Sequence, residues 1–277
     1  MKVLNSSLST EAPLNQTELL PKVSLLETLV STAPYSEFLQ NIISLAQKKI
    51  SSYVCFANVH MLMESRQDQA FKQVVNQANM VTPDGRPLSV LMRLQYGIRQ
   101  DRVCGMDLLP DLLREAETQE LSVYFYGSTP EVLEAIRQRI AQEYPNLRIA
   151  GLESPPFRQL TPEEDQEAVA RINASGAHLV LVSLGCPKQE KWMAAHRGQV
   201  ESCMLGLGQA FLTYTGMEKR LPAWARNLSL EWAYRFYLEP RRLWKRYLVG
   251  NSWFLYSAIK SVLFKSKYKT SEQYIVK

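Results

Sequence analysis

The sequence has few residues of the kinds that build metal centres or disulfide frameworks. Among its 277 residues are four cysteines, at positions 55, 104, 186 and 203, and three histidines, at 60, 178 and 196, all widely spaced. No C-x-x-C pair occurs, which argues against a His/Cys metal site and against a small disulfide-stapled scaffold. We expect reduced, buried thiols and no bound metal.

Several nucleotide-binding and membrane signatures are also missing. The chain contains neither G-x-G-x-x-G nor G-x-x-x-x-G-K-[ST], so nicotinamide dinucleotide and P-loop chemistry lose support. It contains no D-x-D, so a nucleotide diphosphate would have to be neutralised by Arg, Lys and backbone amides rather than by a divalent metal. Residues 1–20 lack the apolar core of a signal peptide, and we expect them to form a loose tail.

Charge is present but unevenly distributed. From Lys219 to Lys277 the chain has thirteen Lys and Arg against three Glu, a net charge of +10, whereas the whole protein carries +5. Residues 1–218 therefore carry −5. A mildly acidic body with a strongly basic C-terminal portion indicates an anionic partner, such as a membrane surface, phosphates or nucleic acid.

Short apolar segments alternate with helical patterns through the body. The predicted strands are 52–57, 79–81, 122–126, 147–151, 179–184 and 203–207, and the predicted helices include 60–78, 87–96, 107–118, 129–144, a helix beginning at Thr161, and 187–196. Strands that are apolar on both faces and separated by helices predict an α/β fold, with a mostly parallel sheet covered on both sides. Ligands of such sheets bind beyond the carboxyl ends of the strands.

The loops that follow the predicted strands hold the candidate site residues. Asp84, in the turn Thr82-Pro83-Asp84-Gly85, could act as a general base or bind a sugar hydroxyl, although Pro-Asp-Gly is also ordinary turn chemistry. Three further segments have glycines where a backbone could approach phosphate: Gly127-Ser128, Gly185-Cys186-Pro187-Lys188-Gln189-Glu190 and Gly206–Ala210, which includes Gly208. Each could equally be a plain strand-to-helix turn.

The segment beyond Arg220 mixes aromatic and basic residues and predicts two or three helices. Arg235, Arg242 and Arg246 recur at helical spacings beside Trp232 and Trp244, which fits phosphate binding, a solvated helix face, a membrane interface or single-stranded nucleic acid. Residues 248–264 are apolar, but Asn251 and Lys260 interrupt them. A membrane-spanning helix needs about 20 apolar residues, so an interfacial helix fits better.

Taken together and in order, these segments resemble the WecG/TagA/CpsF family of bacterial glycosyltransferases, family 26. The resemblance runs from about residue 50 to 247. Its most specific parts are Pro187-Lys188-Gln189-Glu190 and the block formed by Glu231-Trp232, Arg235, Glu239-Pro240 and Arg241. It also includes Asn58, the turn at Asp84, residues 101–107 and Arg220–Trp224.

The resemblance implies a Rossmann-like fold and an inverting hexosyltransferase that uses no cofactor and no metal. The donor would be a UDP-sugar, carrying an N-acetylhexosamine, hexose or hexuronate, and the acceptor a saccharide on polyprenyl diphosphate, in cell-envelope or exopolysaccharide synthesis. The implied catalytic residues are Asp84, as base, Asn58 and Gln189. The expected substrate-binding residues are Gly85, Gly127, Ser128, Gly185, Pro187, Lys188, Glu190, Gly208, Arg220, Arg235, Arg241, Arg242 and Arg246.

The resulting expectation has three parts along the chain: a flexible tail at 1–20, a catalytic domain at 21–218 and a membrane-docking appendage at 219–277. We expect a cytoplasmic protein on the inner face of the plasma membrane that binds no nucleic acid. The sequence leaves open whether it forms a homo-oligomer. Phe56, Phe211-Leu212 and Glu153–Phe157 depart from common family patterns, which leaves the donor sugar open. The alternative is a non-catalytic, nucleotide-responsive protein that binds membranes or nucleic acid.

Overall fold

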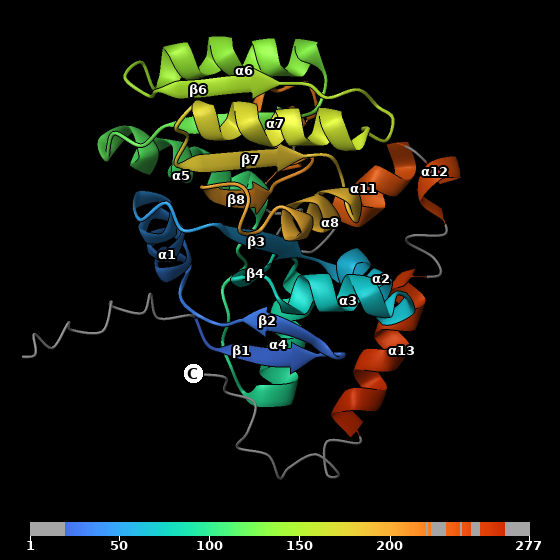
Figure 1. Cartoon of the computed structure of the whole chain (residues 1–277). Helices are drawn as coiled ribbons and strands as arrows, with labels where there is room; N and C mark the ends of the chain where they lie inside the picture. Colours follow the sequence, from blue (N-terminus) through green and yellow to red (C-terminus); the bar gives the residue numbers. More distant parts are fainter. Residues whose placement is uncertain (1–19, 220, 223–230, 239, 245–249, 264–277) are drawn as a thin grey trace, which may run out of the picture.

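A parallel sheet forms the centre of the molecule (Figure 1). The computed structural model describes residues 20–219, 221–222, 231–238, 240–244 and 250–263. The six-stranded sheet has the order β4-β3-β8-β7-β5-β6, and all its pairings are parallel. Its strands are β3 (Ser52–Ala57), β4 (Met80–Pro83), β5 (Val123–Gly127), β6 (Ile149–Glu153), β7 (Leu179–Ser183) and β8 (Cys203–Gly206). The predicted mostly parallel α/β sheet is therefore confirmed.

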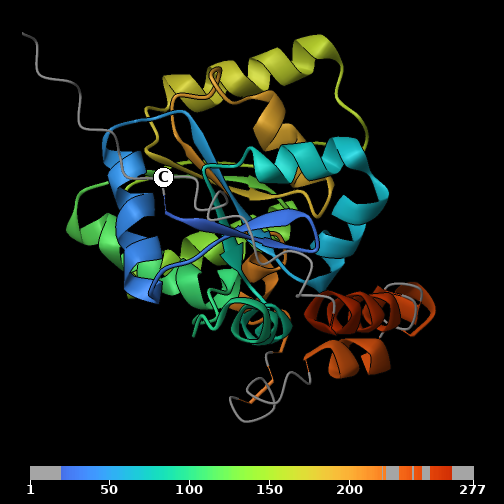
Figure 2. The ribbon, with the colours of Figure 1, turned by 90° about the horizontal axis from the view of Figure 1, so that it is seen from below.

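Helices cover both faces of this sheet, as the apolar strands predict. In the body they are α1 (Tyr35–Gln47), α2 (Val59–Gln67), α3 (Gln69–Asn76), α4 (Arg86–Tyr96), α5 (Gly105–Thr118), α6 (Pro130–Glu143), α7 (Pro162–Ala174), α8 (Lys188–Ala195) and α9 (Ala210–Tyr214). Nearer the C-terminus follow α11 (Glu231–Leu238), α12 (Pro240–Trp244) and α13 (Gly250–Leu263). Figure 2 shows the layers from below, with α3 and α7 on one side of the sheet and α5 on the other.

Alternate residues of each strand feed two separate cores. On β3, Val54 and Phe56 pack with helices α1, α5, α6 and α9, while Tyr53, Cys55 and Ala57 pack with α2, α3, α4, α7 and α8. All six residues of β3 are buried. A strand buried on both faces needs a continuous apolar run, which explains why this segment was recognisable from sequence.

An antiparallel hairpin lies beside the sheet and was not predicted. It pairs β1 (Lys22–Leu25) with β2 (Thr28–Ser31). Its turn residues Leu26 and Glu27 have φ values of 50° and 71°, a conformation in which Gly or Asn is the usual signal. The hairpin packs next to β4, where the Ser31 hydroxyl oxygen accepts a hydrogen bond from the Val81 N–H at 3.1 Å.

The single helix predicted over residues 60–78 is wrong, because two helices occupy this segment. Asp68 ends α2 in an extended conformation and caps α3, its Oδ1 accepting hydrogen bonds from the N–H groups of Ala70 and Phe71. A carboxylate that satisfies two free helix N–H groups favours a new helix start over continuation. By contrast, the predicted start at Thr161 is confirmed as a capping box with Glu164.

The N-terminal tail and parts of the basic segment lie outside the described residues. Of the predicted tail at 1–20, only Leu20 is described, and it is buried. Figure 1 shows α11 and α12 on the side to which the arrows of β6 and β7 point. None of the helices in the described ranges is both long and apolar enough to cross a bilayer.

Candidate active site

The predicted site residues gather at the carboxyl edge of the sheet. Asn58 directly follows β3, and Asp84-Gly85 directly follows β4, its neighbour in the sheet. Ala57 is paired with Pro83, and the Asp84 N–H donates to the Ala57 carbonyl oxygen at 2.8 Å. The two strand ends thus place Asn58 and Asp84 next to each other in the fold.

The carbonyl oxygen of the Asn58 side chain has a structural role, whereas its NH₂ group has none among the described residues. Asn58 is the N-cap of α2, and its Oδ1 accepts a hydrogen bond from the Met61 N–H at 3.2 Å. Its NH₂ group has no hydrogen-bond partner within the described part of the chain, and the residue is partly exposed. The cap fixes the orientation of the amide, so that its two remaining donors are available to a ligand hydroxyl or carbonyl.

Asp84 is half-buried at the start of α4. It lies beside the thiol of Cys104, whose pKa is raised by burial and further by the charge and the hydrogen bond of Asp84. Cys104 is the N-cap residue of α5 and is itself buried. Sequence reasoning did not connect Cys104 to the site, because the contact depends on how the chain returns from α4 to α5. The Val103 N–H, which donates to the Pro83 carbonyl oxygen at 3.0 Å, marks that return.

Gln189 lies two strands away from Asn58, over β8 and β7. Its Oε1 accepts from the Gly185 N–H at 3.2 Å, and its Nε2 donates to the Gly206 carbonyl oxygen at 2.9 Å and to Glu190 Oε1 at 2.8 Å. Only 5% of the residue is exposed. Both amide hydrogens are therefore in use, and the side chain ties the loop after β7 to the end of β8.

Glu190 is fully buried beneath the same loop. Its Oε2 has no hydrogen-bond partner among the described residues. Burial raises the pKa of this carboxyl, and the hydrogen bonds from Gln189 and Cys186 only partly oppose the rise. A side chain with no exposed surface packs against the surrounding loop rather than facing solvent. The predicted contact of Glu190 with substrate therefore stays a prediction.

The glycine loops around these residues are tightly connected to each other. Gly127 has a φ of 110°, and a Cβ there would lie 2.4 Å from the Ser183 carbonyl oxygen, so only glycine fits. The Ser128 N–H donates to that same oxygen at 2.9 Å, and the Gly208 N–H donates to the Val182 carbonyl oxygen at 3.1 Å. These amides join β5, β7 and β8 at the edge where a phosphate was predicted to bind.

The remaining predicted residues fall in less defined positions. Lys188 is exposed at the first turn of α8, and Pro187 precedes it after a cis peptide bond. Arg241 is exposed on α12. Arg235 lies on α11 and Arg242 on α12, but their side chains are outside what the structure describes, and Arg220 and Arg246 lie outside the described residues altogether.

No group of three or more potential metal ligands occurs among the residues that the structure describes. The site consists of a half-buried carboxylate, an oriented amide and a set of glycine loops at one edge of a parallel sheet. This arrangement is that of an α/β protein with polar groups at the edge of the sheet where such folds bind their ligands.

Comparison with known families makes the class specific. The model of the family described as "Glycosyl transferase WecG/TagA/CpsF family" matches residues 23–268. The chain belongs to this family and is a glycosyltransferase, as the sequence resemblance predicted.

Curated relatives have a consistent name. A protein of Bacillus subtilis (strain 168) is 32% identical over 202 residues, which is 73% of this chain and 77% of the relative. A protein of Staphylococcus aureus (strain NCTC 8325 / PS 47) is 30% identical over 198 residues, which is 70% of this chain and 73% of the relative. Both are named N-acetylglucosaminyldiphosphoundecaprenol N-acetyl-beta-D-mannosaminyltransferase.

Proposed function

We propose that this protein transfers a sugar from a UDP-sugar to a saccharide carried on polyprenyl diphosphate, with inversion at the anomeric carbon. The names of the relatives support a diphosphate-linked prenyl acceptor and a β-configured product sugar. An α-linked donor sugar gives a β product by a single displacement. The observation that carries the proposal is the adjacent placement of Asp84 and Asn58 at the ends of β4 and β3.

In this mechanism Asp84 acts as the base. The acceptor hydroxyl gives its proton to the Asp84 carboxylate while its oxygen forms a bond to the anomeric carbon, and the bond from that carbon to the UDP oxygen breaks on the opposite face. A positioned base of this kind contributes about 10²–10⁴-fold in rate. The NH₂ group of Asn58, held by the cap of α2, donates a hydrogen bond to the sugar.

The departing diphosphate needs fixed positive charge or hydrogen-bond donors. We assign this role to Lys188 and to arginines of the C-terminal segment, of which Arg241 is exposed on α12. The amides of Ser128, Gly185 and Gly208 already donate hydrogen bonds within the protein. Preorganised donors stabilise a developing charge without a cost of reorganisation. The assignment of Arg220, Arg235, Arg242 and Arg246 rests on the sequence alone.

A lipid-linked acceptor places the reaction at a membrane surface. The C-terminal segment from Lys219 has a net charge of +10. Attraction to an anionic surface contributes about 1 kcal/mol per basic residue close to it. We therefore assign the protein to the cytoplasmic face of the membrane, held there peripherally by this segment.

The transfer is tested by incubating the protein with a panel of UDP-sugars and N-acetylglucosamine diphosphate linked to a prenyl chain. Mass spectrometry of the product identifies the added sugar, and NMR of its anomeric proton reports the configuration. The expected product is larger by one β-linked N-acetylhexosamine, hexose or hexuronate. Absence of transfer with every donor, or an α-linked product, would overturn the proposal.

Membrane association has a separate test. Co-sedimentation with vesicles that contain anionic lipid should recover most of the protein at low salt and little of it at high salt, because the attraction is screened. Vesicles of neutral lipid are the control. Equal recovery with both kinds of vesicle would remove the basic segment as the cause of binding.

A further inference from the structure

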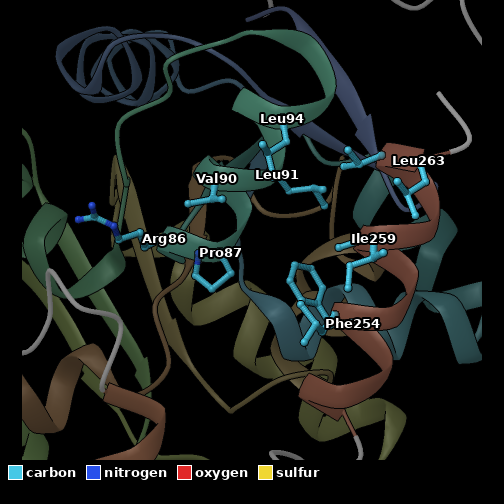
Figure 3. Close-up of a pocket in the computed structure, with 11 residues that line it drawn as sticks. Arg86, Pro87, Val90, Leu91, Leu94, Phe254, Ile259 and Leu263 are labelled. Atoms are coloured by element: carbon cyan, nitrogen blue, oxygen red, sulfur yellow. The ribbon is translucent and has the colours of Figure 1, made fainter. Parts of the chain in front are cut away.

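An apolar groove of about 440 Å³ lies between α4 and α13 (Figure 3). The two helices are far apart in sequence but side by side in the structure. Its lining comes from apolar side chains of both, including Pro87, Val90 and Leu94 on α4 and Phe254, Ile259 and Leu263 on α13.

The groove is a built feature, because α13 is anchored at several points. Phe254 and Ser257 are buried against the body, and the Gln95 side chain donates to the Ser261 hydroxyl at 2.6 Å. The Arg66 guanidinium lies 5.3 Å from the centre of the Trp253 ring. These contacts hold α13 against α2 and α4 and leave the space between α4 and α13 open.

The walls of the groove expose apolar surface to solvent, while its floor does not. Leu91 and Phe254 are buried, whereas Val90 is 49% exposed and Leu263 is 73% exposed. Tyr256, also exposed on α13, does not line the groove. Contiguous exposed apolar surface on a folded protein is characteristic of a binding site rather than of an ordinary face.

One end of the groove begins at the candidate active site. Arg86 and Pro87 line that end, directly after the turn that holds Asp84 and Gly85. Figure 3 shows Pro87 near Phe254, and Leu94 at the other end near Leu263, so α4 and α13 run in the same direction. Arg86 is exposed and has no ion-pair partner in the described ranges. Figure 3 shows the Arg86 side chain pointing away from the apolar lining, so a cation borders the catalytic end of the groove and only apolar side chains line the rest of it.

We propose that this groove binds the first isoprene units of the acceptor's polyprenyl chain, next to its diphosphate. The inference rests on the proposed function, and it adds the place where the lipid lies. An anionic diphosphate followed by an apolar chain matches Arg86 followed by the apolar walls. The 11 residues of α4 give a length of about 16 Å, enough to seat several isoprene units. Continuity with Asp84 favours this occupant over a bilayer or a second copy of the chain.

The test compares two soluble acceptors in the absence of any membrane. Both are N-acetylglucosamine diphosphates, one with a methyl group and one with a farnesyl group, used below the micelle concentration. The farnesyl acceptor should have a KM at least about tenfold lower, because its chain buries apolar surface. In Val90→Asn and Ile259→Asn the ratio of the two KM values should fall toward one. Tyr256→Asn is the matched control and should keep the wild-type ratio.

The possible outcomes separate the groove from the function. Equal KM values for both acceptors in the wild type would overturn the inference that the groove binds the prenyl chain, while the proposed transferase function would remain. If vesicle binding falls in the variants but the ratio persists, the groove contacts the bilayer and the inference is wrong. A change in oligomeric state with an unchanged ratio would make it an interface between copies and is also contrary. No transfer to any acceptor, including the full-length lipid in vesicles, would remove the proposed function and the inference together. Thermal melting of each variant checks that it folds.

Discussion

Two loops at the same edge of the sheet differ sharply in how their polar side chains are used. After β4, Asp84 is half-buried, and the adjacent Asn58 keeps its NH₂ group without a partner in the described structure. After β7, Gln189 is 5% exposed with its amide fully engaged, and Glu190 is completely buried. A group that reacts with substrate must be accessible from solvent, whereas a buried polar group that fixes the shape of a loop needs hydrogen-bond partners within the protein. The first loop therefore suits chemistry and the second suits positioning.

The largest expected effect concerns Asp84. Asp84→Asn keeps the shape and an acceptor oxygen beside Cys104 but removes the base, so kcat should fall by about 10²–10⁴-fold. The melting temperature should stay close to that of the wild type. Both quantities can be measured on the purified protein with a UDP-sugar and a prenyl diphosphate acceptor. Asp101→Asn, an exposed carboxylate, is the control and should change neither. Retention of full activity in Asp84→Asn would show that the loop after β4 is not the reactive one.

The second effect concerns stability at Gln189. Gln189→Leu removes three hydrogen bonds, including one of the donors to the buried Glu190 carboxyl and the amide donor to the Gly206 carbonyl oxygen. This should cost about 1–3 kcal/mol of unfolding free energy. Urea denaturation measures this. Gln199→Leu, which removes one exposed hydrogen bond, is the control and should cost much less. Unchanged stability combined with a loss of kcat as large as that of Asp84→Asn would make Gln189 a catalytic residue and end the contrast between the loops.

Local signals in the sequence were sufficient to predict the strands and turn that position Asp84 and Asn58. The apolar run of 52–57 and the turn at 82–85 predicted two strand ends, and parallel pairing then brings those ends together. The hairpin at Lys22–Ser31 was missed because its turn uses Leu26 and Glu27 at positive φ, where no glycine or asparagine signals it. The break at Asp68 was missed because a capping carboxylate also fits a helix surface.

The engagement of Gln189 depended on contacts that no local pattern contains. Its Nε2 reaches the Gly206 carbonyl oxygen 17 residues away, which requires β7 and β8 to be neighbours. The groove between α4 and α13 is more remote still, because Gln95 and Ser261, which are 166 residues apart, join its walls. Apolar residues on both helices were visible in the sequence, but their juxtaposition is set by the packing of the whole molecule.

A third prediction uses the pH dependence of stability at Glu190. Burial raises the pKa of this carboxyl in the folded state above its value in the unfolded chain. The folded protein therefore binds the proton more tightly, and stability falls as the pH rises from the pKa of the unfolded chain, near 4.5, through the raised pKa of the folded state. Glu190→Gln has no such proton, so it should gain stability relative to the wild type between pH 4 and pH 7.

Urea denaturation of both proteins at the two pH values measures the gain. Glu201→Gln, at an exposed glutamate, serves as the reference and should show no such pH-dependent difference. If the wild type and Glu190→Gln change in parallel with pH, the carboxyl is not perturbed by burial, and the loop after β7 is less closed than its hydrogen bonds indicate.

The smallest effects distinguish the two loops at their glycines. Gly185 has a φ of 81°, so Gly185→Ala places a side chain in the left-handed region and should cost about 1 kcal/mol, although open space surrounds the new Cβ. Gly85 has a φ of −120°, and its Cβ would meet Pro87 Cδ at an ordinary 3.5 Å. Gly85→Ala should therefore be neutral, or stabilising by about 0.4–1 kcal/mol through the unfolded chain. Parallel urea denaturation of the two variants measures both, and an equal cost at the two positions would mean that backbone strain is not confined to the loop after β7.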